Sequence, residues 1–463
     1  MTDQTSLPAA VFKAYDIRGT VPAQLNERFA YRLGLALAAQ SRQEGVRSMV
    51  VGHDGRISSP ALSDALQAGL QTGGLNTVDL GLVHTPLVYF ATHLDGSGSG
   101  VAITGSHNPP EYNGFKLMIA GRTLHGDDIQ ALRTAMADIE APKGIAPGQG
   151  SSQDLVDTYI RHITDHIRLA RPLKIAIDCG NGVGAVVAGR LFRALGCTVD
   201  ELYATVDGTF PNHHPDPADP ANLQDLIAHL QHTDCELGLA FDGDADRLGV
   251  VTRNGQIIWP DRQLILFARD ILQRVPGAPI IFDVKCSRHL VQAIRDAGGV
   301  PTMSQTGHSL IKAKLAETGA PLAGEMSGHI FFNERWYGFD DGLYAGARLL
   351  EILSRSTDPG ALLESLPQGR STPELKLAMA EGEPHRFIAR LQAEGKFPGA
   401  TERITIDGIR AEYPHGFGLA RASNTTPVVV LRFEGDTPEA LKQIQDEFRD
   451  AIRALLPGHA LPF

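Results

Sequence analysis

The chain has 463 residues, of which 43% are hydrophobic and 21% are charged, and its formal net charge is −11 at pH 7. This composition is typical of an ordinary globular protein and excludes a disordered or fibrous chain. Because nucleic acid is held by clustered Lys and Arg side chains, the acidic balance also disfavours a nucleic-acid partner. At about 150 residues per domain, the length predicts three domains or four small ones.

Cysteine usage and the first residues bear on where the protein works. The cysteines form no C-x-x-C pair, which argues against a zinc site or a disulfide framework, and we expect buried thiols in a reducing compartment. They are Cys179, Cys197, Cys235 and Cys286. The first residues include an acid and no apolar segment, and no long uncharged apolar run follows. We therefore expect a cytoplasmic monomer that has no membrane partner.

The apolar pattern in the first part of the chain predicts one α/β unit. Helices are expected at residues 26–40, 60–72 and 126–140, and strands at 48–51, 76–80, 100–103 and 114–118. A stretch rich in Pro and Gly, residues 141–150, closes this unit, so we place the first domain boundary after residue 150.

Two further units repeat this order, and the last part of the chain differs. The second unit has expected strands at 173–177, 197–202 and 236–241 and helices at 185–195 and 222–230; the third has strands at 279–282, 300–303 and 321–323 and helices at 287–296 and 309–318. In the tail, strands at 403–407 and 428–433 flank a Gly-rich loop, and a helix follows at 438–455. The pattern predicts three similar α/β domains with mixed sheets and a C-terminal α+β domain, at 1–150, 151–256, 257–369 and 370–463.

In each of the first three units, a polar loop that contains glycine follows a late strand. These loops are residues 104–109, 242–247 and 324–329. Ligands of open α/β sheets bind at the carboxyl ends of the strands. The loops are therefore expected to converge on one cleft between the domains.

The first loop suits a serine that carries a phosphoryl group. Gly105 allows the backbone to approach a ligand closely, and His107 supplies a donor or a base beside Ser106. The alternative is an ordinary turn at the end of a strand.

The second loop predicts a site for a hard cation. Asp242, Asp244 and Asp246 stand at alternate positions, and oxygen ligands of this kind suit Mg²⁺. An EF-hand is excluded because its sixth position would be Arg247 instead of glycine. The loop also resembles the aspartyl-nucleophile loop of haloacid-dehalogenase-type phosphotransferases, but the third aspartate favours a metal site.

A glycine-rich turn in the second unit leaves a different function open. Gly180, Gly182 and Ala185 fit a dinucleotide-binding fingerprint, with Asp200 and Glu201 at a suitable distance. This pattern would make the protein an NAD-dependent oxidoreductase. A tight turn from strand to helix is the favoured interpretation, because the unit also ends in the acidic triplet that a dehydrogenase does not need.

Three further stretches have both a functional and an ordinary interpretation. Lys116 lies in an apolar predicted strand, where it either faces a site or lies on an exposed sheet edge. The loop 324–329 offers a carboxylate, a hydroxyl and an imidazole that suit sugar binding and proton transfer. The stretch 421–426 combines an arginine with hydroxyls and an amide, which predicts a phosphate cradle.

Taken together, five motifs in chain order resemble the α-D-phosphohexomutase superfamily, and most of all its bacterial phosphomannomutase/phosphoglucomutase branch. They lie at 15–19 (YDIRG), 104–109 (TGSHNP), 242–247 (DGDADR), 324–329 (GEMSGH) and 421–425 (RASNT). The resemblance implies four domains around a central cleft and an enzyme that interconverts hexose 6-phosphate and hexose 1-phosphate, of mannose and glucose. Phosphoglucosamine mutase is the alternative, although Met326 and the Ser-Asn-Thr loop look more like the mannose/glucose branch.

The resemblance also implies roles for individual residues. A phosphorylated Ser106 would donate to small phosphosugars through a hexose 1,6-bisphosphate, which also acts as activator, and Mg²⁺ would be held by Ser106, Asp242, Asp244 and Asp246. The other implied catalytic residues are Arg18, His107, Lys116, Arg247 and His329. The implied substrate-binding residues are Tyr15, Lys285, Thr306, Gly307, His308, Glu325, Met326, Ser327, Gly328, His329, Arg421, Ala422, Ser423, Asn424 and Thr425. One departure is Ala245, where the family often has Gly.

Overall fold

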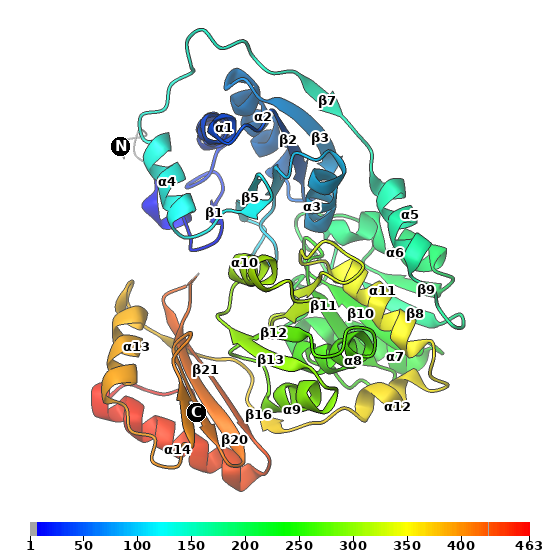
Figure 1. Ribbon diagram of the computed structural model, residues 1–463, viewed down its shortest axis with the longest axis vertical. Helices are drawn as coiled ribbons and strands as arrows, with labels where there is room; N and C mark the ends of the chain where they lie inside the picture. Colours follow the sequence, from blue (N-terminus) through cyan, green and yellow to red (C-terminus); the bar gives the residue numbers. More distant parts are fainter. Residues whose placement is uncertain (1–6, 425) are drawn as a thin grey trace.

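The first three of four structural units share one sheet plan (Figure 1). The computed structural model describes residues 7–424 and 426–463. The strands of the first unit are β1 (Ile17–Thr20), β2 (Ser48–His53), β3 (Asn76–Leu82), β4 (Gly100–Ile103), β5 (Tyr112–Ile119), β6 (Arg122–Thr123) and β7 (Gly150–Ser152). Those of the second are β8 (Lys174–Asp178), β9 (Thr198–Leu202), β10 (Leu237–Phe241) and β11 (Leu248–Thr252), and those of the third are β12 (Pro279–Asp283), β13 (Val300–Ser304), β14 (Leu322–Gly324) and β15 (Ile330–Phe332).

In each of these sheets, three parallel strands lie beside one antiparallel strand. The parallel sets are β3-β2-β4, β9-β8-β10 and β13-β12-β14. Their antiparallel neighbours are β5, β11 and β15. The first sheet is extended by β1 at one end and β7 at the other. This shared plan confirms the prediction of three similar α/β domains with mixed sheets.

The helices of the first unit are η1 (Ala9–Val11), α1 (Glu27–Gln43), α2 (Ser59–Thr72), α3 (Thr85–Leu94) and α4 (Asp127–Met136). Helix α1 begins where the Asn26 side chain accepts a hydrogen bond from the Phe29 N–H at 3.0 Å. It crosses α2 where Gly34 meets Gly69. The helices are so close there that a Cβ on Gly34 would lie 2.3 Å from the Leu66 carbonyl oxygen. Helices α1, α2 and α4 pack on one face of the sheet, and α3 packs on the other.

The second and third units form one continuous hydrophobic core that reaches the α3 face of the first sheet. Their helices are α5 (Val156–His166), η2 (Val183–Val186), α6 (Ala188–Ala194), η3 (Pro220–Leu223), α7 (Gln224–His232), α8 (Pro260–Leu272), α9 (Arg288–Asp296), α10 (His308–Thr318), α11 (Gly342–Leu353) and α12 (Pro359–Glu364). Helix α11 contacts β10 and β11 of the second sheet as well as β15 of the third. The first three units are therefore held together by apolar packing. Within the described residues, the helices are too short or too polar to cross a membrane.

The fourth unit is an antiparallel sheet with a separate core, seen at the lower left of Figure 1. It contains β16 (Arg370–Ser371), β17 (Leu375–Ala378), α13 (Glu383–Glu394), β18 (Glu402–Ile404), β19 (Ile409–Tyr413), β20 (Gly416–Ala422), β21 (Val428–Gly435) and α14 (Pro438–Leu455). The prediction of a Gly-rich loop before residue 426 is wrong, because β19 and β20 form a hairpin there. The glycines leave room for a helix: a Cβ on Gly418 would lie 2.4 Å from the Phe448 ring of α14.

Buried charged groups join the fourth unit to the third. Arg410 of β19 donates to the carbonyl oxygens of Val284 and Cys286, both at 2.6 Å. Glu434 of β21 accepts a hydrogen bond from the Ser287 hydroxyl at 2.7 Å. Because a buried charge is costly unless it is paired, these contacts define how the two units meet.

Helix α11 is capped by a buried carboxyl group that also contacts the second unit. The Asp341 carboxylate accepts from the Tyr344 N–H at 2.9 Å and from the Tyr159 hydroxyl of α5 at 2.8 Å. Burial raises the pKa of Asp341 to about 7. In the unfolded chain an aspartate ionises near its ordinary pKa of about 3.9, so folding retains a proton here.

We predict that Asp341→Asn removes a pH-dependent loss of stability. Between about pH 4 and pH 7 the folded state holds a proton that the unfolded state has lost, so the stability of the native protein falls as pH rises through this window. The asparagine still caps α11, and its gain over the native protein should grow to several kcal/mol, at most about 4, above pH 7. Melting temperatures measured from acidic to neutral pH test this.

Asp358→Asn is the matched control, since Asp358 is an exposed cap that accepts from the Ala361 N–H at 2.9 Å. A difference between native protein and Asp341→Asn that stays constant across this pH range would contradict the prediction.

Candidate active site

Three equivalent turns of the repeated sheet plan meet at one place. Ser106 lies between β4 and β5, Asp242 to Arg247 lie between β10 and β11, and Glu325 to His329 lie between β14 and β15. The contact between the first two turns is very close, because a Cβ on Gly243 would lie 2.3 Å from the Ser106 carbonyl oxygen. The second and third turns are joined by a β-bridge between Arg247 and His329.

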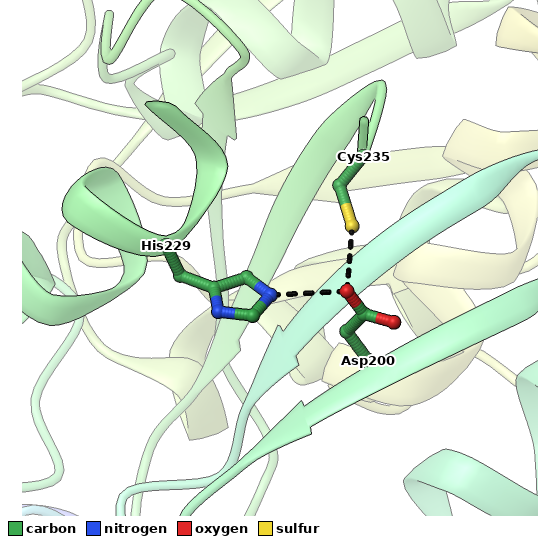
Figure 2. A group of neighbouring side chains, drawn as sticks. All are labelled: Asp200, His229 and Cys235. Atoms are coloured by element: carbon green, nitrogen blue, oxygen red, sulfur yellow. Dashed lines mark hydrogen bonds and ion pairs between the residues drawn. The ribbon is translucent and has the colours of Figure 1, made fainter. Parts of the chain in front are cut away.

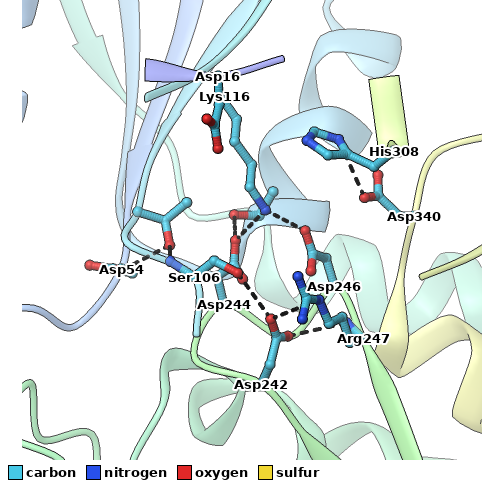
Figure 3. A network of polar contacts seen from close by, with 12 residues as sticks. Asp16, Asp54, Ser106, Lys116, Asp242, Asp244, Asp246, Arg247, His308 and Asp340 are labelled. Atoms are coloured by element: carbon cyan, nitrogen blue, oxygen red, sulfur yellow. Dashed lines mark hydrogen bonds and ion pairs between the residues drawn. The ribbon is translucent and has the colours of Figure 1, made fainter. Parts of the chain in front are cut away.

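Ser106 is held in an unusual conformation against the acidic turn (Figure 3). Its φ angle is 49°, in the left-handed region, and the residue is 1% exposed. Its Oγ donates to Asp242 Oδ2 at 3.2 Å and lies 3.1 Å from His107 Nδ1. Burial, with the nearby Arg247 and Arg18 charges, lowers the pKa of His107 well below its usual range. The serine hydroxyl thus lies between an acceptor and a neutral imidazole.

An ion pair that the sequence analysis did not identify holds this serine turn. Arg56 pairs with Asp54 at 3.2 Å and donates to the carbonyl oxygens of Ser106 and Asn108 at 2.8 and 2.6 Å. Asp54 in turn accepts from the Thr104 hydroxyl at 2.9 Å. The strand exit that contains both residues was visible in the sequence, but nothing there connected it with a turn fifty residues later.

The three predicted carboxylates form one buried cluster. Asp242, Asp244 and Asp246 are each 0% exposed, and a ligand oxygen of each lies within 4.8 Å of the others. Thr85 donates to Asp244 Oδ2 at 2.6 Å, and Lys116 Nζ donates to the same oxygen at 2.7 Å and also to Asp246 Oδ2. Strand β5, which carries Lys116, lies between β1 and β4, so the alternative of a lysine on a sheet edge is wrong.

Charges at this cluster depend on one another. Burial, together with the carboxylates of Asp246 and Asp244, raises the pKa of Asp242 well above its usual range. Burial opposes ionisation of Asp244 as well, but the Lys116 ammonium outweighs it and lowers that pKa. Burial likewise disfavours the Lys116 ammonium, yet the two aspartates raise its pKa well above the usual value. The site therefore holds more negative charge than Lys116 alone neutralises.

The residues present fit a hard divalent cation. The second oxygens, Asp244 Oδ1 and Asp246 Oδ1, are buried and have no hydrogen-bond partner among the described residues. Buried oxygens without partners are costly, and an ion would satisfy them. The donor set consists of carboxylate oxygens beside the Ser106 hydroxyl, which suits Mg²⁺. Lys116 can keep its bonds to the other two oxygens.

Basic groups surround the serine and the acidic turn. Arg247 Nε donates to His329 Nε2 at 3.0 Å, and His329 Nδ1 lies 3.0 Å from Asp340 Oδ2. Because Nε2 accepts from a guanidinium, a neutral His329 carries its proton on Nδ1, beside the carboxylate. Arg18 donates to Asn108 Oδ1 at 2.7 Å and thereby lies over the serine turn. The sequence analysis did not identify Asp340.

The third turn brings the predicted sugar-binding residues together. Glu325 accepts from the Gly307 N–H and from the Ser327 hydroxyl, the latter at 3.3 Å. The ring of Tyr15, from the first unit, lies 5.2 Å from that of His308, and a Cβ on Gly307 would contact it at 3.3 Å. Burial raises the pKa of Glu325, so its carboxyl group retains a proton more readily than an exposed glutamate does.

Two aspartates that the sequence analysis did not single out connect the remaining predicted residues. Asp407 accepts from Arg421 Nε at 2.8 Å and from the Thr306 N–H at 3.0 Å, so it joins the fourth unit to the connection between β13 and α10 of the third. Asp283 accepts from the Thr306 hydroxyl at 2.8 Å and from the Met326 N–H at 3.1 Å. Lys285 lies beside them and is paired with Glu374 of the fourth unit at 2.7 Å.

The other predicted residues lie around these turns. Gly328 has a φ of 104° and leaves room beside Arg247. Ala422 ends β20, and Ser423 and Asn424 follow it in the connection to β21. Thr425 lies outside the described residues. Ala245 has a φ of 57°, in the left-handed region that favours glycine. This conformation explains why glycine, which the family often has here, suits the position.

The dinucleotide-like turn has a structural role at this site. A Cβ on Gly182 would lie 2.9 Å from the Gly243 carbonyl oxygen, and the Val183 N–H donates to that oxygen at 3.1 Å. The glycines thus let the turn pack against the acidic loop instead of cradling a pyrophosphate. Asp200 does not face the turn, because its carboxylate accepts from His229 on α7. The oxidoreductase alternative therefore has no support.

Three repeated α/β domains that meet at a serine and an aspartate cluster, with a fourth α+β domain beside them, are the architecture of the α-D-phosphohexomutases. Comparison with known proteins places the chain within that class. Four models of the family, described as phosphoglucomutase/phosphomannomutase alpha/beta/alpha domains I, II and III and C-terminal domain, match residues 9–143, 157–255, 259–369 and 374–451. The chain belongs to the phosphoglucomutase/phosphomannomutase family.

Individual relatives agree along nearly the whole chain. A phosphoglucomutase from Neisseria meningitidis is 56% identical over 96% of this chain and 97% of its own. A phosphomannomutase/phosphoglucomutase from Pseudomonas aeruginosa is 50% identical over 99% of this chain and 98% of its own. A crystal structure of a family protein from Burkholderia thailandensis superposes with a TM-score of 0.94 at 54% identity, covering 99% of this chain and all of that one.

The close contact between the serine turn and the acidic turn generates a prediction. In Gly243→Ala, the new methyl group would meet the Ser106 carbonyl oxygen at 2.3 Å, and neither backbone can move without separating Ser106 from Asp242. If these two side chains take part in the reaction, a displacement of about 1 Å between them costs about 100-fold in rate. We therefore expect kcat to fall by about that factor while the protein remains folded.

Gly360→Ala in α12 is the control, since a Cβ there meets only one side-chain oxygen, at 3.4 Å. Steady-state rates and circular dichroism of both variants decide the matter, and a Gly243→Ala protein with native kcat would contradict the prediction.

Proposed function

We propose that this enzyme interconverts the 1-phosphate and 6-phosphate of glucose and of mannose through a phosphorylated Ser106. The observation that carries the proposal is the position of Ser106 Oγ, 3.2 Å from Asp242 Oδ2, at the point where the turns of three domains meet. A serine in this place can hold a phosphoryl group against a cation site, with Arg18 and Arg247 nearby to neutralise its charge.

The proposed reaction has two phosphoryl transfers, one from Ser106 to the sugar phosphate and one from the resulting bisphosphate back to Ser106. The bond between phosphorus and Ser106 Oγ breaks as a bond forms to the free hydroxyl oxygen of a hexose phosphate, and a basic group takes the hydroxyl proton. We assign this role to His329, whose Nδ1 faces Asp340; its Nε2 lone pair accepts from Arg247 Nε and would become free to take the proton when Arg247 turns to the phosphoryl group. Lys116 is the second acid/base group that the family resemblance implies. The product is a hexose 1,6-bisphosphate.

We propose that Asp242, Asp244 and Asp246 hold Mg²⁺ together with the oxygen on Ser106. The support is the pair of buried, unpartnered oxygens on Asp244 and Asp246 and the raised pKa of Asp242. A bound Mg²⁺ would supply positive charge against the phosphoryl oxygens. The protein contributes the fixed carboxylates, the Lys116 ammonium that balances them and the exclusion of water by burial.

The bisphosphate must turn end for end before it returns its other phosphoryl group to Ser106. Specificity is therefore expected in contacts to sugar hydroxyls, which we assign to Glu325 and Ser327; the support is that the two side chains lie together in the third turn. Arg421, with Ser423, Asn424 and Thr425, would bind the phosphate distant from the reaction. We propose hexose 1,6-bisphosphate as the activator, since it can rephosphorylate Ser106 after the intermediate escapes.

The names of the relatives support glucose and mannose as the sugars, because the Neisseria protein is a phosphoglucomutase and the Pseudomonas protein is a phosphomannomutase/phosphoglucomutase. We also propose that the enzyme works in the cytoplasm. Its cysteines are free thiols, and all four are buried, which suits a reducing compartment.

The central prediction is a phosphoryl group on Ser106. Incubation with glucose 1,6-bisphosphate should increase the intact mass by one acid-stable phosphoryl group, which peptide mapping places on Ser106. Glucose 1-phosphate or mannose 1-phosphate should then remove it. The Ser106→Ala protein should show neither change. An acid-labile phosphoryl group on Asp242, with Ser106 unmodified, would replace this proposal with an aspartyl-phosphotransferase.

Removal of the cation gives a separate prediction. Excess chelator should abolish turnover, and Mg²⁺ should restore it, because the unbalanced carboxylates repel a phosphoryl group. Asp246→Asn should need at least about tenfold more Mg²⁺ for half-maximal rate. Asp165→Asn, at an exposed position on α5, serves as the control. Full activity in excess chelator would disprove the metal assignment.

A further inference from the structure

A second group of metal-binding residue types lies in the second domain, outside the active site (Figure 2). It consists of Asp200 on β9, His229 on α7 and Cys235 just before β10. His229 Nε2 lies 3.1 Å from Asp200 Oδ2, and Cys235 Sγ donates to the same oxygen at 3.3 Å. The three ligand atoms all lie within 4.8 Å of one another.

The fold brings these side chains together through small residues in the sheet. Asp200 is paired with Ala176 on β8, and Ala176 is paired with Gly238 on β10. A Cβ on Gly238 would lie 2.8 Å from the Leu226 side chain, so the glycine allows α7 to lie close to the sheet. His229, one turn further along α7, therefore reaches the carboxylate.

The arrangement does not form a nucleophilic triad. In such a triad the imidazole would lie between the thiol and the carboxylate, whereas here the carboxylate lies between the other two groups. Burial, with a contribution from the Asp200 carboxylate, raises the pKa of the Cys235 thiol to about 11. A thiol of this kind is a poor nucleophile at neutral pH.

The donor set instead suits a borderline transition metal. An imidazole nitrogen, a thiolate and a carboxylate oxygen are the ligands of four-coordinate Zn²⁺, and Mg²⁺ disfavours the first two. The side chains of Asp200 and His229 are 29% and 30% exposed, so a water molecule can complete the tetrahedron from the solvent side. Lys174 is the neighbouring cation, and its ammonium is already paired with Asp234.

We propose that Asp200, His229 and Cys235 form a site for Zn²⁺ or a similar transition-metal ion, separate from the Mg²⁺ cluster. Binding replaces the S–H bond of Cys235 by a metal–sulfur bond and releases that proton to solvent. The ion then links β9, α7 and the start of β10. Strand β10 ends at Phe241, directly before Asp242, so the two sites lie at opposite ends of one strand, about 20 Å apart.

The spacing of the cysteines alone argues against a zinc site, and for paired cysteines that argument still holds. The group proposed here contains one cysteine and draws its other ligands from a strand and a helix. The fold brings these residues together from separate parts of the chain, so no local sequence motif predicts the group.

Co²⁺ is the probe that tests this site without interference from the aspartate cluster. Full-length protein is treated with chelator, supplied with excess Mg²⁺ to occupy the oxygen-only site, and titrated with Co²⁺. A thiolate bound to Co²⁺ gives a charge-transfer absorption in the near ultraviolet that oxygen ligands do not give. We expect this absorption to rise to one equivalent of Co²⁺ and to be displaced by Zn²⁺.

Variants assign the absorption to the three residues. Cys235→Ser should abolish it, and His229→Gln should weaken Co²⁺ binding by at least about tenfold. Cys197→Ser is the matched control, because Cys197 is a buried cysteine of the same domain that is outside the group. Mutase activity of each variant with Mg²⁺ shows that it is folded.

Absence of the thiolate absorption in the native protein would overturn the proposal, as would its persistence in Cys235→Ser. If Cys235→Ser does not fold, Asp200→Asn replaces it. Asp200→Asn should weaken Co²⁺ binding by at least about tenfold, as expected for His229→Gln. Zn²⁺ should also raise the melting temperatures of the native protein and of Cys197→Ser, but not that of Cys235→Ser, since an ion bound only to the folded state stabilises it.

Discussion

Three carboxylates buried in one turn are the constraint on which the rest of this structure depends. Like charges this close cannot all ionise without positive charge nearby. The turn between β10 and β11 obtains part of that charge from Lys116, which comes from β5 of the first domain. The acidic turn is therefore complete only when the two domains are docked, and the close approach of Gly243 to Ser106 leaves little freedom in that docking.

The repeated sheet plan explains why the chemistry collects at one place. The same turn, between the last parallel strand and its antiparallel neighbour, carries the serine in the first domain, the carboxylates in the second and the predicted sugar-binding residues in the third. Each copy keeps the three parallel strands and their antiparallel neighbour, and the residues of this turn differ from copy to copy. Backbone hydrogen bonds join the copies, from the Thr85 N–H to the Asp244 carbonyl oxygen and from the Leu248 N–H to that of Gly328.

Sequence patterns predicted the parts of the fold that have a local signal. Amphipathic α1 and α14 and the strands before the three polar turns were identified, and the three predicted aspartates lie in one buried cluster beside Ser106. Helices α3, α8 and α11 were not predicted. Nearly all of their residues are buried, and in α8 and α11 these include charged side chains such as Asp261, Arg262 and Arg348, so polarity does not mark an exposed face there. Arg56, Asp340 and Asp407 were missed because their partners are distant in the chain, and only the folded structure brings them together.

The contacts between domains differ on the two sides of the third domain. The first three domains share a continuous apolar core, whereas the fourth has its own and meets the third through buried charges and one small apolar cluster of Val284, Phe417 and Leu419. Separating the first three would expose apolar surface, while separating the fourth would break the hydrogen bonds of Arg410 to the Val284 and Cys286 carbonyl oxygens and of Glu434 to Ser287. Arg421 lies at this boundary, and its carboxylate partner, Asp407, also accepts a hydrogen bond from the Thr306 N–H of the third domain. A phosphate bound to Arg421, as proposed, would therefore compete with a contact that attaches the fourth domain, and substrate binding and domain contact would then be coupled through the same charges.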